Sequence, residues 1–259
     1  MKKNYYEPAT KPTLYFIGVT TSKSSIMNLF PKWAEYLRLG DCEIKGVDFL
    51  PNDETKKYQE CVEFIKNDPL SKGALVTTHK IDIFLSCVDQ FDYLDAHAKI
   101  MGEISCISKD GKKLLGHAKD PISSNLALNS ILPKDYWEQK GGEVLCLGAG
   151  GASIAILYNI NRKKQERNHP SKIFVTDIKQ SRLEALKKIL RKFDTNIPID
   201  LHQCSKSKSN DDMTMNLKPY SLIINATGMG KDKPGSPFTW DVQYPQSSIV
   251  WELNYRGEL

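Results

Sequence analysis

The chain has 259 residues, of which 40% are hydrophobic and 26% are charged, and its formal net charge is +5. This composition is that of an ordinary globular protein with one large or two compact domains. The basic residues form no stripe that alternates with aromatic residues, which argues against nucleic-acid binding. No apolar run reaches the length of about 18 residues that a transmembrane helix requires, and residues 1–12 lack the apolar segment of a secretory signal. We therefore expect a cytoplasmic protein that has no membrane partner.

The six cysteines are scattered along the chain and include no Cys-x-x-Cys pair. Zinc sites and disulfide frameworks typically show regular cysteine spacing. We therefore expect reduced thiols and no metal site.

In the N-terminal half, strand-like apolar runs alternate with amphipathic helical patterns, which is typical of an α/β protein. The expected elements are a strand over 13–19, a helix over 25–39, a strand over 42–50, a helix over 53–67, a strand over 73–78 and a β-hairpin over 103–119. The hairpin turn is predicted at Asp110-Gly111, because Asp-Gly favours tight turns.

The C-terminal half begins with a helix from about Pro121 and then resumes the alternation of strands and helices. Its strands are expected within 144–153, 172–178, 196–203, 220–227 and 248–255. Two polar runs, 161–172 and 205–212, are interpreted as solvated loops. The break between the halves falls near residue 120, which predicts domains over 1–119 and 120–259.

The strongest local signal is "VLCLGAGGAS", residues 144–153, in which a strand runs through a glycine-rich turn directly into a helical pattern. Glycines at such a turn let backbone N–H groups approach a pyrophosphate at the positive end of the helix. Ser153 replaces the third glycine of the usual fingerprint and is small enough for close helix–strand packing. The strand before and the helix after the turn favour a dinucleotide site.

The next strand ends at Asp177, where a carboxylate can accept a hydrogen bond from a free ribose 2′-hydroxyl and would repel a 2′-phosphate. Asp177 can also cap the helix expected over 179–190. Lys179 and Arg182 leave room for NADP, so the sequence predicts NAD as the cofactor, with NADP as the alternative.

The order of several motifs resembles the shikimate dehydrogenase family, which includes quinate/shikimate dehydrogenases. These motifs are "FIGVTTSKSS", "VTTHK", "GHAKDP", "LGAGGAS", "INATGMG" and "VWELNY". The resemblance implies an N-terminal α/β substrate domain, a C-terminal Rossmann-type dinucleotide-binding domain and an NAD(P)-dependent oxidoreductase of aromatic amino acid biosynthesis. In the family, the chain continues beyond "WELNY" into a C-terminal helix, so the resemblance indicates that this sequence is shortened or a fragment.

The resemblance assigns catalysis to Lys80, which is similar to the lysine of the family's V-T-x-P-x-K motif, and to Asp120 in "GHAKDP". Oxidation of a secondary alcohol requires removal of a proton from oxygen, which such a pair can handle. Lys80 as a surface charge and Asp120 as a helix cap are the alternatives. His79 is a possible relay, but a neighbouring strand residue points away from the site.

The substrate contacts of the family are only partly retained. Ser24 matches the first serine of an S-x-S pair, whereas Ile26 replaces the second. Ala74 stands where the family has asparagine before V-T, unless a one-residue deletion keeps Val76-Thr77 in register, and Ser105 replaces a second asparagine. A site that loses several contacts changes its substrate.

The candidate residues fall into two further groups. The substrate-binding candidates are Ser22, Ser24, Thr77 and Ser105. The cofactor-binding candidates are Gly148, Gly150, Gly151, Ala152, Asp177, Asn225, Ala226 and Thr227. The sequence therefore predicts a dehydrogenase, monomeric or homodimeric, that acts on shikimate, quinate or a related cyclic hydroxy acid or polyol. The alternative is a non-catalytic ligand-binding or regulatory protein that has kept the fold.

Overall fold

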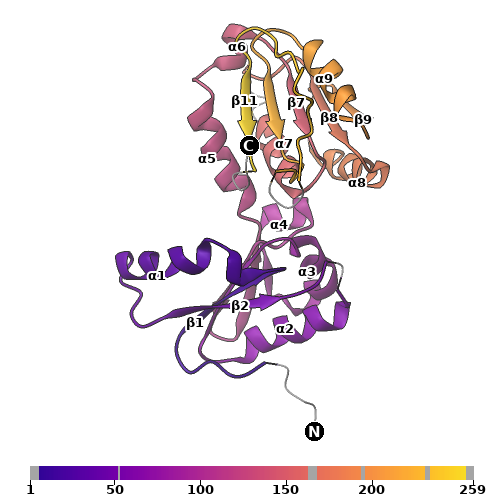
Figure 1. Cartoon of the computed structure of the whole chain (residues 1–259). Coiled ribbons are helices and arrows are strands. Elements are labelled where there is room, and N and C mark those ends of the chain that lie inside the picture. Colours follow the sequence, from indigo (N-terminus) through magenta and orange to yellow (C-terminus); the bar gives the residue numbers. More distant parts are fainter. Residues whose placement is uncertain (1–5, 52, 163–167, 194–195, 231–233, 255–259) are drawn as a thin grey trace. The chain divides into compact units, whose positions relative to one another are not determined.

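The computed structural model describes residues 6–51, 53–162, 168–193, 196–230 and 234–254 (Figure 1). The chain divides into two compact units, Met1–Lys119 and Asp120–Leu259. Each unit contains a sheet with parallel strand pairs and several helices, which confirms the predicted α/β class. None of the described helices combines the length and the apolar character that crossing a membrane requires.

The first unit alternates strands and helices as the sequence predicts. Its elements are β1 (Thr13–Gly18), η1 (Thr21–Lys23), α1 (Ile26–Tyr36), β2 (Glu43–Asp48), α2 (Thr55–Asn67), β3 (Ser71–Val76), α3 (Lys80–Cys87), η2 (Val88–Gln90), β4 (Tyr93–Leu94), α4 (Ala96–Met101), β5 (Cys106–Asp110) and β6 (Lys113–His117). The strand order is β2-β1-β3-β5-β6-β4. Strand β1 is parallel to β2 and β3, and β5 and β6 form the predicted antiparallel hairpin.

The core of the first unit lies between the sheet and the helices α2 and α3. Helix α2 buries residues at helical spacing, from Tyr58 through Cys61 and Val62 to Ile65, as an amphipathic helix does when one stripe faces a core. They pack in one cluster with buried strand residues such as Ile17 and Val76, and with Ile83 of α3. This packing places the carboxyl ends of β1 and β3 next to the start of α3.

The second unit has the topology of a dinucleotide-binding fold. Its elements are α5 (Asp120–Ile131), α6 (Tyr136–Lys140), β7 (Val144–Leu147), α7 (Gly151–Arg162), β8 (Ile173–Asp177), α8 (Gln180–Leu190), β9 (Ile199–Gln203), α9 (Ser207–Met215), β10 (Leu222–Asn225) and β11 (Ile249–Glu252). The strand order is β11-β10-β7-β8-β9, and the neighbouring strands pair in parallel. The chain leaves β7 toward one edge and later returns through β10 toward the other. The carboxyl ends of β7 and β10 therefore mark the switch point where ligands bind in open α/β sheets.

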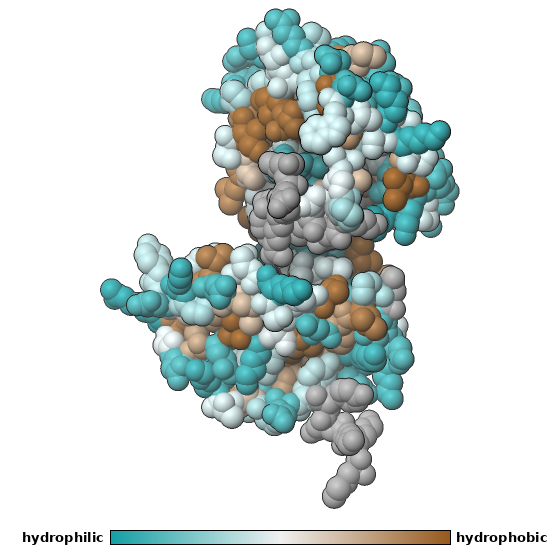
Figure 2. Space-filling model, viewed as in Figure 1, coloured by the Kyte–Doolittle hydropathy of each residue, from teal (hydrophilic) through white to brown (hydrophobic). Residues whose placement is uncertain are grey.

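Strands β7 and β10 are buried along their whole length, which explains their continuous apolar sequences. Helices α5 and α7 pack against each other within this unit. Figure 2 shows hydrophilic residues over much of the visible face of each unit, with patches of hydrophobic residues scattered among them.

The interpretation of 205–212 as a solvated loop is wrong, because Ser207–Met215 form α9. Two of its polar side chains are buried because they pair with a distant loop: Asn210 donates to the Pro237 carbonyl, and Asp211 accepts from the Thr239 N–H. Part of the other polar run, 163–167, lies outside the described residues.

Candidate functional site

The glycine-rich turn links β7 to α7 and packs tightly against the turn after β10. Gly148 has a φ of +95°, and a Cβ at this position would lie 2.7 Å from the carbonyl oxygen of Ala226. Its N–H donates to the Thr176 carbonyl at 2.7 Å. Gly148 is therefore required by the fold itself, because an L side chain fits neither the φ nor the space.

Gly150 is different, because a Cβ built on it meets no atom within 4 Å. Directly after it, α7 begins at Gly151, and the first N–H groups of a helix have no partner within the helix. Ser153 is fully buried, and its hydroxyl donates a hydrogen bond to the Gly148 carbonyl, which links the start of α7 to the turn. The turn thus leaves open space at a helix N-terminus, and this fits the diphosphate of a dinucleotide.

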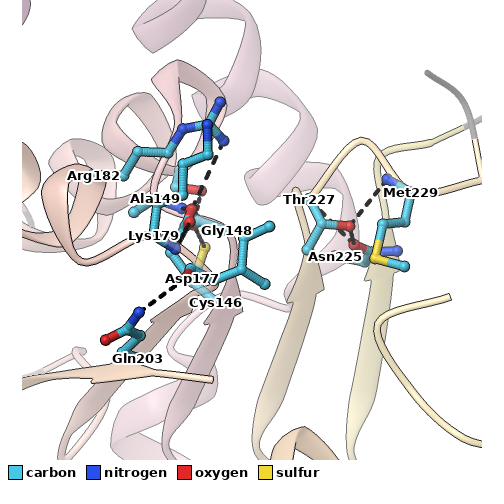
Figure 3. Close-up of polar contacts among 12 residues, drawn as sticks. Cys146, Gly148, Ala149, Asp177, Lys179, Arg182, Gln203, Asn225, Thr227 and Met229 are labelled. Carbon is cyan, nitrogen blue, oxygen red and sulfur yellow. Dashed lines mark hydrogen bonds and ion pairs between the residues drawn. The ribbon is translucent and has the colours of Figure 1, made fainter. Parts of the chain in front are cut away.

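Asp177, at the end of β8, holds this turn in place (Figure 3). One carboxylate oxygen accepts the Ala149 N–H at 2.9 Å, and the other accepts the Lys179 N–H at 2.8 Å. The side chain is only 3% exposed, and the Arg182 guanidinium lies 3.9 Å away. Through these contacts Asp177 stabilises the glycine-rich turn and the start of the segment that leads into α8, which is close to the predicted capping role. Its binding to a ribose stays a prediction.

A cavity of about 290 Å³ lies within the second unit, next to the end of β8. Its lining includes the predicted Gly148, Asp177 and Thr227. The lining residues that were not predicted as cofactor contacts are Thr176, Ile178, Arg182, Cys204, Ser205, Lys206, Ser207, Asn210, Met229, Pro234 and Pro237. Half of those after β9 belong to the run 205–212 that was interpreted as a loop. Their position in the sequence could have indicated them, because the residues that follow β9 lie at the same edge of the sheet as the end of the neighbouring parallel strand β8.

The turn after β10 is shaped by Asn225, whose buried side chain forms hydrogen bonds through both its oxygen and its nitrogen (Figure 3). Its Oδ1 accepts the N–H and the hydroxyl of Thr227, at 3.2 and 2.7 Å, and its Nδ2 donates to Glu252 at 2.7 Å. Glu252 also accepts two hydrogen bonds from Asn254. Neither Glu252 nor Asn254 is predicted as a site residue from the sequence, although both lie within the motif "VWELNY".

Lys80 is the first residue of α3 in the first unit, and Asp120 is the first residue of α5 in the second. The strand expected to end at residue 78 ends at Val76 instead. The intervening turn includes Thr78 with a φ of +54°. A β-branched residue rarely adopts this left-handed conformation.

The expectation that His79 follows strand alternation is wrong, because the chain has already left the strand. His79 is fully buried and lies 2.9 Å, through Nδ1, from the hydroxyl of Tyr58. The Phe49 ring meets it edge-on at 5.8 Å between ring centres.

The four substrate candidates lie in the first unit with different exposure. Ser22, in η1, is exposed, whereas Ser24 and Thr77 are half-buried. The Ser105 hydroxyl is buried and accepts the Lys119 N–H at 2.7 Å. The Thr77 N–H donates to the Ile17 carbonyl, and its side chain remains a candidate contact.

The chain resembles curated shikimate dehydrogenases in sequence, although no family model matches it. It is 24% identical over 203 residues to shikimate dehydrogenase (NADP(+)) of Lactococcus lactis, covering 78% of this chain and 66% of the relative. It is 30% identical over 160 residues to the Bacillus subtilis protein of the same name, covering 61% of this chain and 50% of the relative. The chain thus spans between half and two thirds of the length of these relatives.

The chain also shares its fold with solved structures. The structure of shikimate 5-dehydrogenase from Listeria monocytogenes, in complex with shikimate and NAD, matches with a TM-score of 0.68 and 18% identity, covering 96% of this chain and 81% of that one. The sequence comparison confirms the resemblance drawn from the motifs: the chain is similar to shikimate dehydrogenases in sequence and shares their fold.

Proposed function

We propose that the chain is an NAD(P)-dependent dehydrogenase that interconverts a secondary alcohol and a ketone on a cyclic polyol or hydroxy acid. The observation that carries the proposal is the open space at Gly150, at the N-terminus of α7 and at the switch point of a parallel sheet. In this proposal residues 120–259 bind the cofactor and residues 1–119 bind the substrate.

The nicotinamide, when bound, exchanges the hydride. This chain supplies the backbone N–H groups that start α7 for the diphosphate, and Thr227 and Asp177 line the adjoining cavity. NAD is proposed as the preferred cofactor, because a 2′-phosphate close to the Asp177 carboxylate is repelled. Arg182 lines the same cavity and attracts phosphate. Parallel titrations with NADH and NADPH decide between them, and tighter binding of NADPH would refute the preference.

The reaction also requires a group that exchanges the proton of the substrate hydroxyl. The proposal assigns this task to Lys80 and assigns to Asp120 a hydrogen bond that orients the same hydroxyl. General acid–base groups contribute roughly 10²–10⁴-fold to the rate. Lys80→Ala should therefore lose turnover by a factor in this range while cofactor affinity stays unchanged.

Shikimate itself should be a poor substrate. Ala74 is fully buried and offers no polar group, and the Ser105 hydroxyl already accepts the Lys119 N–H and donates to the His117 carbonyl. A site that lacks the polar contacts for a ring discriminates against that ring. The substrate is therefore proposed to be a related ring with a different hydroxyl or carboxylate pattern.

The test is a screen of cyclic polyols and cyclic hydroxy acids, including shikimate and quinate, for reduction of NAD and NADP. Lys80→Ala and Asp120→Asn are then measured on each hit, with Lys72→Ala, an exposed lysine of β3, as the matched control. Turnover that survives in Lys80→Ala would refute the assignment of Lys80. Saturable binding of cofactor and ring acids without any turnover would instead establish the non-catalytic alternative.

A further inference from the structure

Two energetically unfavourable features lie directly before Lys80, the first residue of α3. Thr78 has a φ of +54°. His79 is 0% exposed, and its Nε2 has no hydrogen-bond partner among the described residues. Backbone strain and unsatisfied buried polar atoms are uncommon, and they concentrate where function requires them.

The imidazole of His79 is held from the neighbouring helix. Its Nδ1 lies 2.9 Å from the hydroxyl of Tyr58 on α2 and 3.5 Å from a carboxylate oxygen of Asp82. Tyr58 is itself only 1% exposed, and burial, followed by the charge of Asp82, raises its pKa to about 12. The hydroxyl therefore stays protonated and available to the ring.

The neutral ring cannot satisfy both nitrogens in either tautomer. If the proton is on Nε2, Tyr58 donates to Nδ1 and the Nε2–H has no acceptor among the described residues. If the proton is on Nδ1, the Nε2 lone pair has no donor. A phenylalanine would fill a similar space without an unsatisfied atom, so stability alone does not account for histidine here.

The backbone of this turn is hydrogen-bonded at both ends, and within it the His79 N–H donates to the Thr77 carbonyl. The Thr77 N–H donates to Ile17 at 2.9 Å, and the Lys80 carbonyl accepts the Ile104 N–H at 3.0 Å. Between them, the side-chain anchor is the imidazole of His79, buried against Tyr58 and Phe49.

The geometry points to His79 as a positioning residue: through Tyr58, it fixes the strained turn that presents Lys80 at the start of α3. This inference rests on the proposed role of Lys80. It adds that the reaction depends on a buried pair that touches neither substrate nor cofactor.

The test compares the double variant Tyr58→Phe/His79→Phe with wild type on the substrate that the screen identifies. The double variant removes both polar groups, so its unfolding midpoint should equal or exceed that of wild type. Its kcat should nevertheless fall at least tenfold, while KM changes less than threefold. Tyr15→Phe, which also removes a buried tyrosine hydroxyl bonded to a carboxylate of the same unit, is the control and should keep kcat. A double variant with kcat within twofold of wild type would overturn the inference.

Conservative variants keep the inference testable if the double variant does not fold. The amide oxygen of His79→Asn can take the place of Nδ1 and accept from Tyr58, whereas the longer side chain of His79→Gln places its amide near the position of Nε2. His79→Asn should therefore retain at least fivefold more kcat than His79→Gln. Equal values for the two variants would refute the inference.

A second readout does not depend on turnover. The rate at which an amine-reactive reagent modifies Lys80, followed by mass spectrometry and normalised to the exposed Lys72, should rise at least threefold in the His79 variants and stay unchanged in Tyr15→Phe. If wild type shows no dehydrogenase activity, the proposed function fails while this labelling ratio still decides whether His79 positions Lys80. An unchanged ratio would overturn the inference.

Discussion

Alanine at Gly148 and alanine at Gly150 should have opposite effects, because one glycine is required by the fold and the other faces open space. At Gly148, the φ of +95° costs an L residue about 1–2 kcal/mol. The Cβ, 2.7 Å from the backbone oxygen of Ala226, adds about 1–3 kcal/mol of overpacking. After a gain of about 0.4–1 kcal/mol from the less flexible unfolded chain, Gly148→Ala should lose about 1–4.5 kcal/mol of stability.

At Gly150, neither penalty applies, because φ is outside the left-handed region and no atom lies within 4 Å of the added Cβ. The melting temperature should therefore stay within about 2 °C of wild type, whereas Gly148→Ala should melt roughly 5–10 °C lower. Although Gly150→Ala should be stable, it should lose affinity for the cofactor. A methyl group at Gly150 displaces the diphosphate from the helix N-terminus, and the loss of about two charge-assisted hydrogen bonds, roughly 3 kcal/mol, weakens binding about 100-fold.

The assay pairs thermal unfolding with a fluorescence titration of NADH and NADPH on the same protein samples. The proposed cofactor site predicts that Gly150→Ala is stable and does not bind. Wild-type affinity in stable Gly150→Ala would refute the reasoning, because the diphosphate would then not approach this turn.

Three further outcomes follow from single buried groups. Asp177→Asn should lose roughly 1.5–3 kcal/mol of stability in urea unfolding, because an amide can accept only one of the two backbone N–H groups. The exposed ion-pair partner Asp200, changed to Asn, should cost less than about 1 kcal/mol, and equal losses would contradict the structural role of Asp177. Burial alone would raise the pKa of Asp68, but hydrogen bonds, mainly from two backbone N–H groups, outweigh it and hold this pKa below its ordinary value. The stability that Asp68 contributes is therefore present above about pH 4 and is lost as the pH falls through the lowered folded-state pKa. Asp68→Asn should accordingly be less stable than wild type at pH 7, with a gap that narrows below pH 4, and a gap independent of pH would refute this. Finally, burial raises the pKa of Cys146 to about 11, so iodoacetamide at pH 8 should label the half-buried Cys42 at least tenfold faster, as peptide mass spectrometry can check.

Local sequence pattern was sufficient for the features that depend on neighbouring residues. The hairpin formed by β5 and β6 follows from Asp110-Gly111 between two alternating runs. The β7–α7 turn follows from glycines between an apolar strand and an apolar helix. Both signals lie within a few residues of the structure that they specify.

Features that depend on distant partners could not be predicted in this way. The α9 sequence reads as a solvated loop because the groups that pair with Asn210 and Asp211 lie about 27 and 28 residues away. The burial of His79 depends on Tyr58, which is 21 residues away on another helix. The sequence correctly predicts Asp177 at the end of a strand, but the hydrogen bond that its carboxylate accepts from the Ala149 N–H depends on the pairing of β7 with β8.

The pairing of β7 with β10 has a consequence for the order in which the second unit can assemble. Val144 pairs with Leu222, and Gly148 packs against the carbonyl of Ala226, so the glycine-rich turn lacks one of its packing partners until the chain has been synthesised beyond Ala226. Parallel strands that are distant in sequence also pair slowly, because the chain between them must first be ordered. During translation the glycine-rich turn therefore reaches its final packing only after β10 has been made, and a nascent chain that stops before residue 226 should bind NADH far more weakly than the whole chain.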